Sequence, residues 1–119
     1  MAVSLKKVEK WKQKKKVDKL VRALSVEDRE IRIAVVKALG ECKNESAMHS
    51  LISLLKDPDE STRIATIEAL AAMANGRSIE FIRQVWSADN SEAVREKAKW
   101  AISIIRENMA KEEKDKIFA

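Results

Sequence analysis

The chain has very little of the material that makes tight turns, disulfides and metal sites. Its 119 residues include two Gly, one Pro, one Cys, one His and no Tyr. Because Gly and Pro are the residues that most often interrupt helices, their scarcity favours a helical protein, as does the abundance of Leu, Ala, Lys and Glu. A single cysteine excludes an internal disulfide and is typical of a reducing compartment, so we expect a cytoplasmic protein.

Long apolar runs are missing as well. No stretch approaches the about 18 consecutive apolar residues that a transmembrane helix needs, so no membrane span is expected. The first residues, MAVSLKKVEKWKQKKK, lack the apolar stretch and the small-residue cleavage site of a secretory signal. The length fits a single domain over residues 1–119.

Negative charge is scarce at the N-terminal end. Residues 1–22 contain nine Lys and Arg against Glu9 and Asp18, a charge of +7, whereas the whole chain has a net charge of +5 and the other 97 residues therefore sum to −2. The basic patch consists of Lys6, Lys7, Lys10, Lys12, Lys14, Lys15 and Lys16. Three interpretations stay open: the solvated face of a capping helix, a contact for nucleic-acid phosphates, or a helix on a membrane surface, for which the apolar strip is narrow.

What the sequence does contain is a segment that recurs. Residues 57–70, DPDESTRIATIEAL, match residues 26–39, VEDREIRIAVVKAL, at an offset of 31, and a weaker copy over residues 89–102 follows at an offset of 32. Each copy has apolar residues at helical spacing, and in the second copy Asp57-Pro58 separates two helices. Two helices cannot bury such an apolar face alone, so neighbouring copies must stack.

We therefore predict an all-α protein built from stacked helical hairpins. The predicted parts are an N-terminal capping helix in residues 1–16, three two-helix units in residues 17–44, 45–76 and 77–109, and a charged tail in residues 110–119. Helices are expected near residues 4–13, 17–25, 27–42, 46–56, 58–74, 78–87 and 91–114.

The second unit resembles a known repeat. Leu-Lys-Asp-Pro-Asp at residues 55–59, followed by Arg63 and by Ala69-Leu70, looks like the turn and second helix of a HEAT repeat, of the short type also found in phycobilisome lyases. The resemblance covers residues 17–107 and implies a right-handed α-α superhelix, an α-solenoid that binds other proteins.

The resemblance also implies a role for one arginine in each unit. It pairs Asp57 with Arg63 and Asp89 with Arg95 in a ladder of charge-assisted bonds along the stack. Arg32 belongs to the same series, but Val26 stands where its aspartate is expected. The alternative is a stripe of arginines that binds phosphates.

The second helix of each unit presents an arc of residues away from its core stripe. The predicted partner-binding residues on these arcs are Val36, Lys37, Ile67, Glu68, Lys99, Trp100, Ser103 and Ile104. Packing between neighbouring second helices is the alternative for the aliphatic members. Trp100 has three explanations: the tail folds back and covers it with Ile117 and Phe118, the protein forms a homodimer there, or a partner binds there.

Other apolar residues are assigned to the core. Trp86 aligns with Leu24 and Leu55, which predicts a buried side chain, and Cys42 aligns with core positions of the other units. In the capping helix, Leu5, Val8 and Trp11 are expected to form the inward stripe.

Motifs for catalysis are absent from the sequence. His49 is the single histidine and lacks the His-Glu pairs of the di-iron site in the HEAT-repeat hydroxylase, and Cys42 with His49 supplies too few ligands for zinc. We therefore expect no cofactor and no metal, and a non-enzymatic scaffold or adaptor that binds a protein or peptide as a monomer or homodimer. The alternatives are a nucleic-acid-associated protein that uses the basic patch and an accessory subunit of an enzyme such as a lyase.

Overall fold

A computed structural model describes residues 2–118, and within this range the chain forms helices and turns but no strand. The helices are α1 Leu5–Gln13, α2 Val17–Arg22, α3 Arg29–Cys42, α4 Met48–Ser53, α5 Glu60–Met73, α6 Ile79–Ala88 and α7 Glu92–Phe118. Short 3₁₀ turns extend them: Ala23–Ser25 after α2, Glu45–Ala47 and Leu54–Lys56 around α4, and Gly76–Ser78 before α6. Residue 1 of the predicted cap and residue 119 of the predicted tail lie outside the described range.

The helices α3 and α5 begin and end in the same way. Asp28 accepts a hydrogen bond from the Ile31 backbone N–H at 3.1 Å, and Asp59 accepts one from the Thr62 backbone N–H at 2.9 Å. Each carboxylate therefore satisfies one of the free N–H groups at a helix start. Both helices end at a left-handed residue, Lys43 or Ala74, with φ near 53° and 52°.

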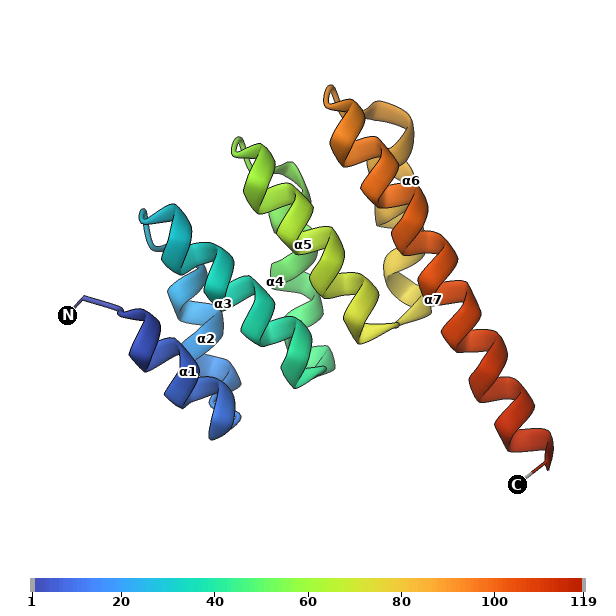
Figure 1. Cartoon of the computed structure of the whole chain (residues 1–119), viewed down its shortest axis with the longest axis horizontal. Helices are drawn as coiled ribbons and strands as arrows, with labels where there is room; N and C mark the ends of the chain where they lie inside the picture. The colour runs from blue at the N-terminus through green and yellow to red at the C-terminus, as the bar shows by residue number, and fades with distance from the viewer. Residues whose placement is uncertain (1, 119) are drawn as a thin grey trace.

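The helices stack as successive hairpins. The pairs α2–α3, α4–α5 and α6–α7 form units 1, 2 and 3, and α1 packs against α3 at the N-terminal end. In Figure 1 the second helices α3, α5 and α7 lie side by side in front, and the first helices α2, α4 and α6 lie behind them. The protein is thus an α-solenoid of three helical hairpins with an N-terminal capping helix.

The core follows the repeat offset. Leu20, Leu51 and Ile82, each 31 residues apart, are fully buried on the three first helices. Leu39 and Leu70 hold equivalent positions on α3 and α5 and are also buried. One continuous apolar core therefore joins the units, as the repeat predicted.

A glycine brings two second helices unusually close. A Cβ added to Gly40 on α3 would lie 2.8 Å from the Cα of Ala69 and 2.9 Å from its Cβ on α5. Since real Cβ atoms do not approach so closely, α3 and α5 pack at this distance only because residue 40 has no side chain.

Three sequence predictions about burial and length are wrong. Trp86 is 40% exposed because no further unit covers it among residues 2–118, and Leu5 is 47% exposed at the edge of α1. The sequence predicts that the last helix ends near residue 114, but α7 runs for 27 residues to Phe118. Nothing in residues 110–118 stops it, since this segment contains neither Gly nor Pro.

Candidate protein-interaction surfaces

The second helices leave one face of the stack partly apolar. At repeat-equivalent positions, α3 carries Ile33 and Lys37, α5 carries Ile64 and Glu68, and α7 carries Trp100. We define the second-helix face as Ile33, Lys37, Ile64, Glu68, Trp100 and Ile104. The isoleucines are half-buried, whereas Lys37 and Glu68 are exposed and Trp100 is 44% exposed.

Two of the predicted partner-binding residues do not belong to this face. Val36 and Ile67 have no exposed surface, so the prediction that they contact a partner is wrong. Val36 lies one turn from Arg32, which reaches Thr62 on α5, and one turn from Gly40, which touches Ala69. Arg32, Val36 and Gly40 thus form a row on α3 that faces α5, and packing against α5 buries Val36.

Trp100 sits in a small charged cluster. The Lys97 Nζ lies 4.9 Å from the centroid of its ring, and the same amine lies 3.5 Å from Glu68 Oε2 on α5. The cation over the ring and the ion pair both orient Lys97 across the boundary between units 2 and 3. Trp100 therefore lies at the boundary between units 2 and 3, in contact with Lys97 and partly exposed to solvent.

The last segment of the chain does not cover Trp100. Figure 1 shows the C-terminal part of α7 continuing straight past the stack, and Ile117 and Phe118 are 67% and 79% exposed. The prediction that these two residues fold back onto the tryptophan is wrong, because the helix does not turn. Dimerisation and a protein partner remain as explanations for its exposure.

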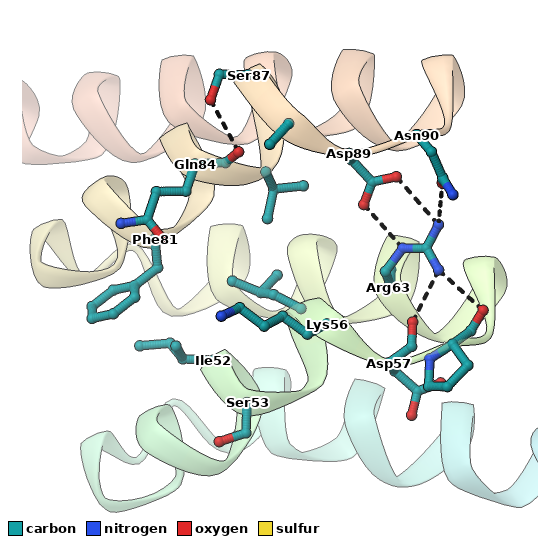
Figure 2. Close-up of a pocket in the computed structure, with 14 residues that line it drawn as sticks. Ile52, Ser53, Lys56, Asp57, Arg63, Phe81, Gln84, Ser87, Asp89 and Asn90 are labelled. Carbon is teal, nitrogen blue, oxygen red and sulfur yellow. Dashed lines mark hydrogen bonds and ion pairs between the residues drawn. The ribbon is translucent and has the colours of Figure 1, made fainter.

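The first helices enclose a second surface that sequence reasoning missed. A groove with a volume of about 1080 Å³ separates α4 and its following 3₁₀ turn from α6. Figure 2 shows Ile52 and Phe81 toward one end of this α4–α6 groove and Lys56 between its walls. A smaller groove of about 520 Å³ lies between α2 and α4. The first helices are thus spaced more widely than the second helices.

An arginine bridge closes the other end of the α4–α6 groove. Arg63 donates from Nε to Asp89 Oδ2 at 3.0 Å and from Nη2 to Asp89 Oδ1 at 3.2 Å. Its Nη1 donates to the carbonyl oxygens of Asp57 and Pro58 at 2.9 and 3.1 Å. Figure 2 shows Arg63 between these two turns. A bidentate, largely buried pair of this kind ties unit 2 to unit 3.

The ladder differs in detail from the expected pairing. The backbone carbonyls of Asp57 and Asp89 accept hydrogen bonds from the arginine of their own unit, Arg63 and Arg95. The carboxylate of Asp89 accepts hydrogen bonds from Arg63, the arginine of the preceding unit. Arg32 likewise uses the carbonyl of Val26, so the missing aspartate there does not remove its bond. Its Nε and Nη2 donate to Thr62 Oγ1, each at 3.2 Å.

A shared hydrogen-bond network supports the Arg32 rung. Thr62 is fully buried, and its hydroxyl donates to Asp59 Oδ2 at 2.8 Å. Arg29 also contacts the Asp59 carboxylate at 3.0 Å. The hydrogen bond from Thr62, followed by the nearby positive charges of Arg29 and Arg32, lowers the pKa of Asp59 below its usual value. These bonds favour a structural role for the arginines over a phosphate-binding stripe.

The basic patch is only partly free to bind a partner. Lys12 contacts Glu41 on α3 at 3.0 Å and Glu9 at 3.1 Å, and these hydrogen bonds, Glu41 first, raise its pKa. Lys12 therefore fastens the cap to unit 1. Lys7 is half-buried and donates to the Ala2 carbonyl. The exposed members are Lys6, Lys10, Lys14, Lys15 and Lys16.

The residues considered for chemistry lie apart from any site. Cys42 is half-buried at the end of α3, and desolvation raises the pKa of its thiol, which lowers its reactivity. His49 is exposed on α4. Residues 2–118 hold no group of three or more His, Cys, Asp or Glu side chains placed to bind a metal ion. None of the helices in this range is long and apolar enough to cross a membrane.

The stacked hairpins, joined by an arginine at each boundary, define a helical-repeat protein of the α-solenoid class. The sequence matches the HEAT repeats family over residues 48–114 and the PBS lyase HEAT-like repeat over residues 31–57. The chain belongs to the HEAT-repeat family, as the resemblance implied. A comparison with curated proteins finds no match to this chain. HEAT repeats generally serve as scaffolds for protein interactions, and such scaffolds are generally non-enzymatic.

Proposed function

We propose that this protein is a non-enzymatic scaffold that binds a protein or peptide partner on its second-helix face. The observation that carries the proposal is Trp100, which is 44% exposed and lies against Lys97 at the boundary between units 2 and 3. Trp is enriched among the residues that contribute most of the binding energy of protein interfaces, and these residues cluster near the centre of the interface. Ile104 lies one turn further along α7 and extends the apolar surface.

The rest of the second-helix face supports a partner with a mixed apolar and polar surface. Ile33 and Ile64 continue the apolar strip across units 1 and 2, and Lys37 and Glu68 lie beside them. Lys99 and Ser103, which were also predicted to contact a partner, are exposed along the outer edge of α7. A helix laid across α3, α5 and α7 fits this arrangement, because its apolar stripe meets the isoleucines and its polar flanks meet the charges.

The test compares two aromatic residues of similar exposure on opposite sides of the stack. Trp100→Asp alters the second-helix face, and Phe81→Asp alters the α4–α6 groove, where Phe81 is 41% exposed. Each purified variant and the native chain are used for affinity capture from native lysate, and the captured partner is then purified and titrated. We expect the Trp100 variant to lose the partner and the Phe81 variant to retain it.

The controls separate binding from folding. Both variants should keep the helical circular dichroism spectrum of the native chain, because neither side chain belongs to the buried apolar core. Loss of the partner in the Phe81 variant alone would move the site to the α4–α6 groove and overturn the proposal. Equal capture by all three proteins would also overturn it.

A second candidate function, nucleic-acid binding, is favoured by the five exposed lysines of the basic patch, which lie at one end of the stack and form no ion pair within residues 2–118. Deleting residues 1–16 is a poor test, because Val8 is buried and Lys12 holds α1 against α3. Replacing Lys6, Lys10, Lys14, Lys15 and Lys16 with Gln keeps those contacts. A mobility shift of DNA or RNA at low salt that disappears in this variant would support the candidate.

A further inference from the structure

Unit 3 has an outer side that faces away from unit 2, and the residues on it differ from those at equivalent positions in units 1 and 2. We call this surface the open end and define it by Trp86, Arg95, Lys99 and Ser103. Among residues 2–118, no further unit packs against it. The residues at equivalent positions in units 1 and 2 are covered by the next unit, and the contacts that they make there indicate which chemical groups the open end can bind.

The Arg95 side chain makes one hydrogen bond within residues 2–118, whereas Arg32 makes four and Arg63 makes five. Arg63 binds its own turn through Nη1 and the Asp89 carboxylate of the next unit through Nε and Nη2. Arg95 repeats the first contact, from Nη1 to the Asp89 carbonyl at 2.6 Å. Within residues 2–118, its Nε and Nη2 have no hydrogen bond or ion pair. The edge of the guanidinium that binds a carboxylate in unit 2 is therefore unoccupied in unit 3.

Trp86 supplies an apolar contact beside this arginine. The equivalent pairs in units 1 and 2 each line one groove. Leu24 and Arg32 line the groove between α2 and α4, and Leu55 and Arg63 line the α4–α6 groove. Repeat geometry thus places Trp86 and Arg95 on one surface. The leucines are 8% and 4% exposed, whereas Trp86 is 40% exposed. A repeat whose outer side only faced solvent would carry a polar residue there, because solvated ends of repeat arrays are polar.

Two other residues argue against another HEAT unit at the open end. The positions of Val36 and Gly40 in unit 1, and of Ile67 and Ala71 in unit 2, are occupied in unit 3 by Lys99 and Ser103. All four residues in units 1 and 2 are buried by the next second helix. A helix packed in the same way on unit 3 would bury the Lys99 ammonium without a partner, which is costly.

We propose that the open end binds an acidic segment of a partner protein that also carries an apolar side chain. One carboxylate pairs with Nε and Nη2 of Arg95, as Asp89 pairs with Arg63, and a second lies near Lys99. The apolar side chain packs on Trp86. Lys99 and Ser103 border both surfaces, but Trp86 and Arg95 belong only to the open end and Trp100 only to the second-helix face, so variants at these three residues distinguish the two proposals.

Charge disfavours a second copy of the chain as the occupant. Head-to-tail stacking would bring the exposed lysines of α1 against Arg95 and Lys99, and pairing two open ends would bring these cations against each other. A nucleic acid carries a denser row of negative charges than a segment with two carboxylates, so Glu92 and Glu96, on the same helix as the two cations, disfavour a nucleic acid more strongly.

The test uses a probe based on the turn that Arg63 already binds. A fluorescein-labelled peptide of Leu-Asp-Asn-Ser-Glu repeats carries the residue types of the Asp89–Glu92 turn, and a matched peptide replaces Asp with Asn and Glu with Gln. Fluorescence anisotropy measures binding of each peptide to the full chain. We expect the acidic peptide to bind at least about tenfold more tightly than the amide peptide, and added salt to weaken it.

Four variants locate the site. Arg95→Gln, Lys99→Gln and Trp86→Leu should each weaken the acidic peptide, the first by about tenfold as expected for loss of a charge-assisted bond. Lys111→Gln removes the same charge elsewhere on α7 and should change nothing. Lys99 is exposed, and Leu is the residue of units 1 and 2 at position 86, so these two variants should fold even if the arginine variant does not.

Several outcomes would overturn the proposal. Equal binding of both peptides removes the carboxylate requirement, and absence of binding removes the site. Loss of binding on replacing Lys6 and Lys10 with Gln, with no effect of Arg95 or Lys99, moves the acidic site to the basic patch. A dimer in light scattering that Lys99→Gln dissolves identifies a second copy as the occupant, and preference for a single-stranded oligonucleotide over the peptide identifies a nucleic acid.

Discussion

Replacing Gly40 with Ala tests the close packing of α3 and α5. In an isolated helix this change is favourable by about 1 kcal/mol, because Ala is the best helix former and Gly among the poorest. Here the new methyl group would meet the Cα, Cβ and carbonyl oxygen of Ala69 at 2.8, 2.9 and 3.2 Å. Two of these atoms belong to the backbone of α5, so the helix itself has to move.

The size of the effect follows from two opposing terms. Inserting a methyl group into a well-packed core costs about 1 to 3 kcal/mol. Subtracting the helix-propensity gain leaves Gly40→Ala less stable by about 1 kcal/mol, and by up to about 2 kcal/mol if α5 resists displacement. For a domain of this size, about 1 kcal/mol corresponds to a decrease in Tm of about 4 °C.

Urea unfolding followed by circular dichroism measures the change, and the second glycine of the chain is the control. A Cβ on Gly76 would lie 2.8 Å from Sδ and 2.9 Å from Cε of Met109, the flexible end of an exposed side chain. Met109 can rotate away, so Gly76→Ala should leave the free energy of unfolding nearly unchanged. A Gly40→Ala protein more stable than the native chain would show that α3 and α5 are not in this contact.

Two further predictions concern the bonds between units. Arg63→Ala should lower the free energy of unfolding by about 2 to 3 kcal/mol, because it leaves the Asp89 carboxylate, 9% exposed, without its bidentate partner. Arg95→Ala breaks only a contact within its own unit and should lower the free energy of unfolding clearly less. Equal losses for the two variants in urea unfolding would contradict the ladder. The lowered pKa of Asp59 implies a contribution to stability that is present above the unfolded pKa near 4 and is lost as the pH falls through the lower folded pKa. Asp59→Asn keeps a helix-capping side chain but should flatten this acid limb, and an unchanged pH dependence of the unfolding midpoint would show that another carboxyl group controls it.

Repeat spacing predicted the helices and the core of each unit because both depend on nearby residues. The offset of 31 placed Leu20, Leu51 and Ile82 in equivalent positions, and all three are buried. The same reasoning could not separate Val36 from Lys37, since both lie away from the core stripe of their own hairpin. What buries Val36 is α5, and the orientation of α5 is not encoded in the periodicity of α3.

The ends of the stack were predicted least well for a related reason. Trp86 aligns with two buried leucines, and alignment predicts the same environment for all three. Leu24 and Leu55 owe part of their burial to the unit that follows, and that neighbour is missing for Trp86 in residues 2–118. The α4–α6 groove was missed because it lies between units, where the spacing of the first helices decides its width.

The different spacing of the two helix layers explains why binding is better placed on some surfaces than on others. The second helices are linked by the close contact at Gly40, the Arg32 and Arg63 rungs and the Lys97–Glu68 pair, so we expect side chains on them to change position little. A partner that binds Trp100 therefore loses little free energy in ordering the scaffold. Within residues 2–118, the Arg63 bridge at one end is the one polar link across the α4–α6 groove, so a ligand there would have to hold the walls in place itself. On this reasoning the unpaired edge of Arg95 is a better binding site for a partner than the groove, because the hydrogen bond from Nη1 to the Asp89 carbonyl already orients the guanidinium.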